Sequence, residues 1–140
     1  MDVYNGDYIN EMGLTDGMTE EFLQKNRETT EIQRANFKKA HQAGVKIVFG
    51  TDAGVYPHGQ NAKQFSYMTK HGMTNLEAIR AATVIAAEVL GMEEEIGRVE
   101  EGFFADIIAL SDNPLINIKS LEDIHFVIKE GYLYKKRSKE

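Results

Sequence analysis

The sequence predicts a fold of the α/β class, and three observations support this prediction. The segment VKIVF (residues 45–49) is a short and nearly continuous apolar run, and it begins directly after a segment with helical periodicity. Such a run is typical of a strand buried on both faces of a parallel sheet. The segment TNLEAIRAATVIAAEVLG (residues 74–91) has apolar residues at helical spacing. Beyond residue 91 the pattern changes to short strands separated by turns, which indicates a β module.

Two helical patterns surround the predicted strand, and a loop precedes them. Residues 1–18 contain three glycines and several Asp and Asn residues, and we expect a loop there. Thr19 is suited to be the N-cap of a helix that runs to about Ala43 and stops at Gly44. After a loop over residues 50–61, the segment AKQFSYMTKHG predicts a short helix that ends at Gly72.

The pattern over residues 74–91 is the clearest helix in the sequence. Thr74 and Glu77 have the spacing of a capping box, and Gly91 closes the helix. From residue 92 we expect a turn, a short strand, a second strand near residues 104–111, and a hairpin that turns at Glu130-Gly131. The boundary between a helical part and a β part is therefore expected near Gly91.

Composition excludes several classes of function. The chain has 140 residues, of which 42% are apolar and 27% charged, as is usual for a globular protein. The net charge of −6 argues against nucleic-acid binding through a basic surface. The absence of cysteine excludes disulfides, thiolate zinc sites and Cys nucleophiles. No apolar run approaches the roughly 18 residues of a membrane span, and no signal peptide is visible, so a cytoplasmic location is expected.

Asp52 stands directly after the predicted buried strand, and it is the main candidate for chemistry. In parallel α/β sheets, ligands bind beyond the carboxyl ends of the strands, which is where Asp52 would lie. The alternative is a local role, in which the carboxylate caps the following helix or forms an Asx turn. Position alone leaves both interpretations open.

Several motifs resemble the amidohydrolase superfamily, whose members are metal-dependent hydrolases on a TIM barrel. VKIVFGTDAGVYPHG is similar to the last barrel strand and the loop that follows it. GMTNLEAIRAATVIAAEVLGMEEEIGRVEEGFFADIIALSDNPL is similar to the final barrel helix and the C-terminal β segment, and VIKEGYLY to the closing hairpin. MDVYNGDYI looks like the segment after the seventh strand in the Xaa-Pro dipeptidase and imidazolonepropionase-like branch. The resemblance covers essentially the whole chain.

This resemblance implies a partial TIM barrel. Residues 1–91 would form the C-terminal part of the (β/α)8 barrel, from the end of strand 7 through helix 8. Residues 92–140 would form the C-terminal β segment of a small, composite β-sandwich domain. A complete barrel needs about 250 residues, so the chain is too short to contain one.

The resemblance also implies a chemistry, the hydrolysis of C–N bonds in amides, peptides or cyclic amides. Asp52 corresponds to the family's metal ligand and proton acceptor, and the expected cofactor is a divalent metal, zinc in particular. His58 lies in the same loop and is a candidate for contact with a small-molecule or dipeptide-like substrate. Tyr4 and Tyr56 would flank the barrel mouth, where each either binds substrate or packs as a buried tyrosine.

The chain departs from the family pattern, because the strands that carry the family's other metal ligands are missing. His41, His58, His71 and His125 include no His-x-His pair. His41 and His71 are expected at helix ends and His125 at the start of a strand, all in structural roles. A catalytic zinc takes three protein ligands plus water, so we expect the chain alone to bind metal weakly and to be inactive. Asp106 in GFFADII is expected to be a turn or strand-end residue.

Two other functions remain open at this stage. A barrel fragment exposes sheet edges and apolar faces, so the chain could be an interaction fragment that associates with the missing N-terminal barrel portion or with itself. A phospho-accepting receiver module would need an acidic pair beside a strand, and Asp2 and Asp7 are not next to a predicted strand.

Overall fold

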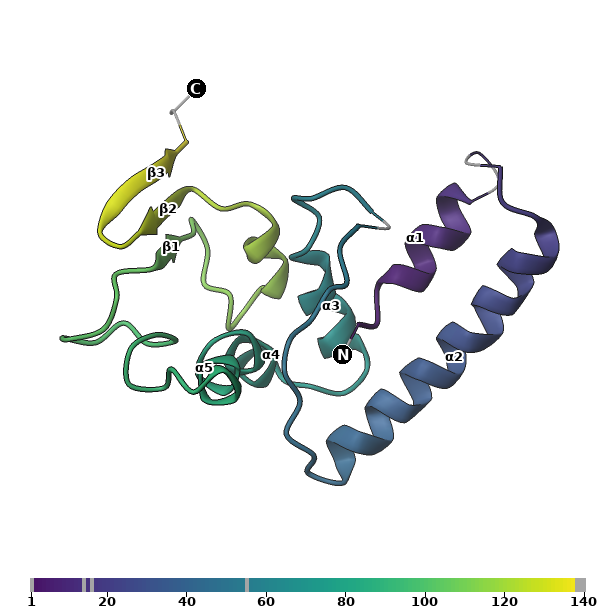
Figure 1. Ribbon diagram of the computed structural model, residues 1–140, viewed down its shortest axis with the longest axis horizontal. Helices are drawn as coiled ribbons and strands as arrows, with labels where there is room; N and C mark the ends of the chain where they lie inside the picture. The colour runs from purple at the N-terminus through teal and green to yellow at the C-terminus, as the bar shows by residue number, and fades with distance from the viewer. Residues whose placement is uncertain (1, 14, 16, 55, 138–140) are drawn as a thin grey trace.

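The computed structural model describes residues 2–13, 15, 17–54 and 56–137 (Figure 1). Two antiparallel helices lie at one end of the molecule, a small sheet lies at the other, and shorter helices lie between them (Figure 1). The elements are α1 (Asn5–Met12), α2 (Glu20–Gln42), α3 (Lys63–Lys70), α4 (Asn75–Ala82), α5 (Val84–Leu90), β1 (Ile107–Ala109), the 3-10 helix η1 (Ile118–Glu122), β2 (Phe126–Lys129) and β3 (Tyr132–Lys136). Within the described residues, no helix has both the length and the apolar character needed to cross a membrane.

The predicted N-terminal helix is confirmed, but the loop expected before it is wrong. Thr19 caps α2 by accepting a hydrogen bond from the backbone N–H of Phe22 at 3.2 Å, and Gly44 follows the helix with φ 72°. Residues 5–12 form α1 rather than a loop. A Cβ at Gly6 would lie 1.9 Å from the Thr30 hydroxyl, so the missing side chain is what lets α1 approach α2 so closely. This tertiary contact overrides the weak helix propensity of Asn, Gly and Asp.

The buried Arg34 and the Tyr67 hydroxyl connect α1, α2 and α3 through Asp7. Arg34 of α2 forms an ion pair with Asp7 of α1 at 2.7 Å, and its Nε and Nη2 donate to the carbonyl of Val3 at 3.2 and 3.1 Å. The hydroxyl of Tyr67 in α3 donates to the same Asp7 carboxylate at 2.5 Å. Burial raises the pKa of Tyr67, and the hydrogen bond to Asp7 raises it further, so the phenol stays protonated and donates.

The extended segment over residues 45–50 differs from the buried strand that the sequence predicts. No strand forms there, and the backbone N–H of Phe49 donates to the carbonyl of Ala81 at 3.0 Å. Ile47 is buried, whereas on the opposite face Lys46 is exposed and Val48 is only half-buried, so the expected burial on both faces is wrong. A strand exists only when a neighbouring strand pairs with it, and the described residues place none beside this segment. The core against which Ile47 packs comprises Val3, Phe37, Met68, Met73, Ala78 and Ala81.

The helix predicted over residues 74–91 forms, but as two helices. Thr74 and Glu77 make the predicted capping box, and Gly91 ends α5 with φ 67°. Between them Thr83 has φ −124° and ψ −99°, which separates α4 from α5. The backbone of Gly97 approaches this break, because a Cβ there would lie 3.0 Å from the Thr83 carbonyl. The following turn thus packs directly on the break.

The β module after Gly91 is a three-stranded antiparallel sheet in the order β1-β2-β3. The predicted hairpin is confirmed, because Glu130 and Gly131 have φ 51° and 82°, as a tight two-residue turn requires. Asp106 acts as a strand-end residue, accepting from the N–H of Glu130 at 2.8 Å and pairing with Lys129 at 2.6 Å. The short strand expected between residues 92 and 104 is absent, since turns occupy this segment.

The β module docks on the helices through polar contacts. The hydroxyl of Ser66 in α3 donates to Glu122 at 3.3 Å, and the side-chain amide of Asn75 donates to the Leu115 carbonyl at 3.0 Å. The assignment of residues 1–91 and 92–140 to two domains stays a prediction.

Arg34→Ala is expected to lower the free energy of unfolding by about 2 kcal/mol, because it leaves the half-buried Asp7 carboxylate without its cation and the Val3 carbonyl without its donor. Denaturation in urea at pH 7 measures the change. Arg27→Ala is the matched control, since the ion pair of Arg27 with Glu20 is largely exposed and is worth about 0.5 kcal/mol at most. Equal losses in the two variants would contradict a special role for the buried arginine.

Thr74→Ala is expected to cost about 1 kcal/mol of unfolding free energy at pH 7, because the capping box is lost. Hydrogen bonds from the backbone and side chain of Thr74 hold the pKa of Glu77 below 4.5, its ordinary value. A lowered pKa means that the stabilisation by Glu77 is complete above pH 4.5 and is lost as the pH falls through the lower folded value. Urea denaturation between pH 7 and pH 3 should therefore show the two proteins converging; a constant difference would contradict this assignment.

Candidate functional site

Asp52 lies at the carboxyl end of the extended segment, and its side chain is exposed. Its φ is 45°, in the left-handed region that residues other than glycine rarely adopt. Among the described residues, no hydrogen bond or ion pair engages its carboxylate. Capping or an Asx turn would place a backbone N–H on that carboxylate, and the described residues show no such bond. The carboxylate is thus open to a ligand, in a backbone conformation that often marks functional sites.

Side chains from the start of α3 hold the backbone just before Asp52. Gln64, which is fully buried, donates from Nε2 to the Gly50 carbonyl at 3.0 Å and accepts from the Val3 N–H at 3.1 Å. The side-chain amide of Asn61 donates to the Thr51 hydroxyl oxygen at 3.1 Å. Neither role could be inferred from the sequence, because the partners lie 10, 14 and 61 residues away along the chain.

The two predicted tyrosines lie together beside this loop. The rings of Tyr4 and Tyr56 make an edge contact with centroids 5.0 Å apart, and both residues are buried. The hydroxyl of Tyr56 donates to the Thr51 carbonyl at 3.2 Å, and that of Tyr4 donates to the side chain of Gln60 at 3.1 Å. Burial raises the pKa of Tyr56, so its hydroxyl stays protonated as a donor. Both hydroxyls have partners within the chain, and a role in substrate binding stays a prediction.

His58 lies in the loop that follows Asp52, between Pro57 and Gly59, and it is exposed. Gly59 has φ 98°, which turns the chain back toward α3. The loop therefore presents the imidazole to solvent, and its predicted contact with substrate stays a prediction.

The other three histidines lie where structural roles were expected. His41 near the end of α2 pairs with Glu77 at 3.3 Å, and His125 just before β2 approaches Asp123 at 3.6 Å. His71 is the C-cap residue of α3, and burial lowers its pKa.

Asp2 is a second carboxylate in this neighbourhood, and sequence analysis assigned it no role there. Its Oδ1 accepts from the N–H groups of Tyr4 and Asn5 at 3.1 and 3.3 Å, at the start of α1. Burial raises the pKa of Asp2, and the negative charge of Asp52 acts in the same direction. The signal available in the sequence is an Asp shortly before a helix, which is typical of a capping residue.

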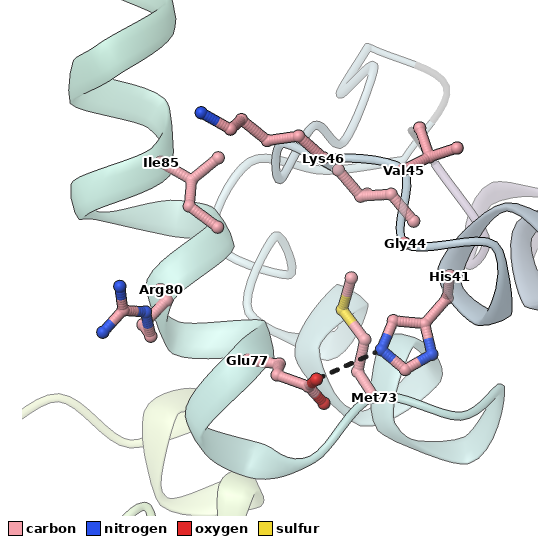
Figure 2. A pocket seen from close by; sticks show the side chains of 9 residues that line it. His41, Gly44, Val45, Lys46, Met73, Glu77, Arg80 and Ile85 are labelled. Atoms are coloured by element: carbon pink, nitrogen blue, oxygen red, sulfur yellow. Dashed lines mark ion pairs between the residues drawn. The ribbon is translucent and has the colours of Figure 1, made fainter.

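A cavity of about 210 Å³ lies at the opposite, N-terminal end of the extended segment (Figure 2). Figure 2 shows the ion pair of His41 and Glu77 at the lower right, with Arg80 of α4 and Ile85 of α5 at the left. Val45, Lys46 and Ile47 line the cavity, and none of the described residues in the loop over residues 50–61 does. Ligands of parallel α/β sheets bind at the carboxyl ends of strands, so this cavity is not the candidate active site.

The donor set for a metal is incomplete within this chain. No cluster of three or more His, Asp or Glu side chains suited to a metal occurs among the described residues. Asp52 offers one carboxylate, whereas a catalytic zinc takes three protein ligands. The side chains present fit one position of a metal site and not the whole of it.

Comparison with known proteins identifies the class and then the family. A Xaa-Pro dipeptidase solved with methionine in its active site superposes with a TM-score of 0.84 and 40% identity, over 95% of this chain and 33% of its own. Ochratoxinase from Aspergillus niger is 35% identical over 125 residues, which are 86% of this chain and 26% of the relative. Imidazolonepropionase from Rubrobacter xylanophilus is 50% identical over 42 residues, which are 30% of this chain and 10% of the relative. These relatives are hydrolases, of which the chain spans a third or less.

The profile of the amidohydrolase family matches residues 7–133. The chain belongs to the amidohydrolase family. Its similarity to the Xaa-Pro dipeptidase and imidazolonepropionase confirms the predicted branch, and the fold class is confirmed as a partial α/β barrel segment followed by C-terminal strands.

Asp52→Gly is expected to be more stable than Asp52→Ala by about 1 kcal/mol, because only glycine adopts the left-handed conformation without steric cost. Thermal and urea denaturation measure the difference. Asp112 is a matched control, since it is exposed and its φ is not positive. At Asp112 the Ala variant should be more stable than the Gly variant. If the Gly variant were the more stable at both positions, backbone strain at Asp52 would be contradicted.

Proposed function

We propose that this chain supplies the C-terminal part of the active site of a metal-dependent amidohydrolase that cleaves C–N bonds. The observation that supports the proposal best is the Asp52 carboxylate, which is exposed at the end of the extended segment and held in a left-handed turn. A strained backbone that leaves a carboxylate open to solvent is understandable if the carboxylate serves a ligand.

In this proposal Asp52 is one metal ligand and the proton carrier of the reaction. A divalent metal, zinc in our proposal, lowers the pKa of water toward about 7 when bound. The Asp52 carboxylate takes a proton from the attacking water and delivers it to the nitrogen of the leaving group. Its exposure favours this transfer, because among the described residues it makes no hydrogen bond that would have to break first.

The substrate we propose is a small amide, in particular a dipeptide-like molecule. The names of the Xaa-Pro dipeptidase and the imidazolonepropionase support hydrolysis of a peptide or cyclic amide. We propose that His58 contacts the substrate, and its exposure in the loop that carries Asp52 supports this role. We propose that Tyr4 and Tyr56 form a wall of the substrate site beside that loop. Because each hydroxyl already bonds another residue of the chain, they would contribute through the shape of the site more than through hydrogen bonds to substrate.

The remaining ligands would come from the N-terminal barrel portion that the relatives possess. We propose residues 1–91 as the C-terminal part of the barrel and residues 92–140 as the β segment of a composite domain. The isolated chain would then bind metal weakly and have no activity, since Asp52 alone cannot hold a catalytic zinc.

A second candidate is a non-catalytic interaction fragment that associates with itself. Val45 is 55% exposed on the extended segment, and Val89 and Leu90 at the end of α5 are each 65% exposed. Such apolar surface favours association. Light scattering of the isolated chain tests this candidate, and a compact monomer would contradict it.

Asp52→Asn is expected to lower kcat at least 100-fold in the assembled enzyme, because the amide cannot carry the proton. The assay is hydrolysis of a Xaa-Pro dipeptide with added Zn²⁺, using the chain mixed with the N-terminal two thirds of the Xaa-Pro dipeptidase relative. Asp106→Asn is the control, since Asp106 lies in the β module and pairs with Lys129. Full activity of Asp52→Asn alongside an active wild type would refute the proposed role.

A further inference from the structure

We infer that Asn61 is a positioning residue that orients the Asp52 carboxylate by fixing the backbone before it. The consequence for catalysis rests on the proposed function, whereas the orientation itself does not. Asn61 makes two side-chain hydrogen bonds at the turn. Its Nδ2 donates to the Thr51 hydroxyl oxygen at 3.1 Å, and its Oδ1 accepts from the N–H of Gly59 at 3.1 Å.

The direction of these bonds separates Asn61 from an ordinary helix cap. A capping side chain accepts from backbone N–H groups two or three residues later in the helix. The helix α3 begins at Lys63 with Ala62 as its N-cap, and no side-chain cap bond is present. The amide of Asn61 instead faces backward, toward Gly59 and Thr51, so its bonds connect the two arms of the Asp52 loop.

Two further side chains fix the same short segment. Gln64 donates to the Gly50 carbonyl, and the Tyr56 hydroxyl donates to the Thr51 carbonyl. Both oxygens of Thr51 thus accept hydrogen bonds, from residues 5 and 10 positions further along the chain. The carbonyl of Gly50 accepts one from a residue 14 positions further along. A left-handed backbone persists at a residue other than glycine only when its surroundings determine it.

The hydrogen bonds at Gly50 and Thr51 fix the left-handed turn and thereby set the direction of the Asp52 side chain. The carboxylate makes no bond to other described residues, so it does not itself stabilise the loop. A relaxed backbone at Asp52 would point the carboxylate elsewhere, and misplacement of a reacting group by about 1 Å can reduce a rate 100-fold. Asn61 is the member of this set that is only half-buried, which makes it the one to vary without emptying the core.

The test uses the 140-residue chain, labelled with ¹⁵N and ¹³C, and observes the backbone and carboxyl signals of Asp52 by NMR. Asn61→Ala and Thr51→Val each remove one end of the same hydrogen bond. We expect each substitution to move the chemical shifts of Asp52 away from those of a left-handed backbone. The double variant should move them no further than Asn61→Ala alone. Asn61→Asp is expected to restore them, because a carboxylate can accept from both Gly59 N–H and the Thr51 hydroxyl.

Gln60→Ala is the matched control, because its side-chain amide lies in the same loop but bonds Tyr4 and Lys63. The Asp52 signals should stay in place in this variant. Unchanged Asp52 signals in Thr51→Val, or an equal shift in Gln60→Ala, would overturn the inference. Thr51→Val keeps the shape of the side chain, so it decides the matter even if Asn61→Ala does not fold.

A second readout concerns the assembled enzyme. Asn61→Ala is expected to lower kcat about 10- to 100-fold with little change in KM, as a misdirected proton carrier would. A loss confined to KM would overturn the positioning role. The NMR experiment needs neither metal nor substrate, so a failure of the proposed hydrolysis and a failure of this inference are distinguishable.

Discussion

The buried side chain of Gln64 is the contact on which the site depends. It joins the Val3 N–H to the Gly50 carbonyl, two backbone groups that are distant in sequence and that precede α1 and the Asp52 loop. A buried amide must satisfy its hydrogen bonds, so the two segments are held in one arrangement. The guanidinium of Arg34 reinforces this arrangement by donating to the carbonyl of Val3.

The site and the fold are coupled through polar contacts more than through a large apolar core. Asp7 accepts from both Arg34 and Tyr67, which ties α1 to α2 and α3. The loop that follows the extended segment is held against α3, because Gln64 lies in the first turn of that helix and Asn61 lies just before it.

Membership of the amidohydrolase family explains why the Asp52 carboxylate has no cluster of further metal ligands around it among the described residues. The chain spans 33% of the similar Xaa-Pro dipeptidase. In the proposed function, Asp52 completes a site whose other members stand on the remaining part of the barrel. The extended segment over residues 45–50, which no described strand accompanies, is consistent with this view, since a parallel strand forms only beside its neighbours.

The sequence by itself determined the N-cap at Thr19, the capping box at Thr74, the helix end at Gly91 and the hairpin at Glu130-Gly131, because each depends on residues close together in the chain. It also determined the family, through motifs that extend over most of the chain. It also singled out Asp52 by its place after an apolar run. Only the tertiary structure decided that α1 is a helix, that Thr83 interrupts the long helix, and that Asn61 and Gln64 hold the Asp52 turn. These features depend on contacts between distant segments, such as Gly6 with Thr30 and Gly97 with Thr83, whose energies no local pattern encodes.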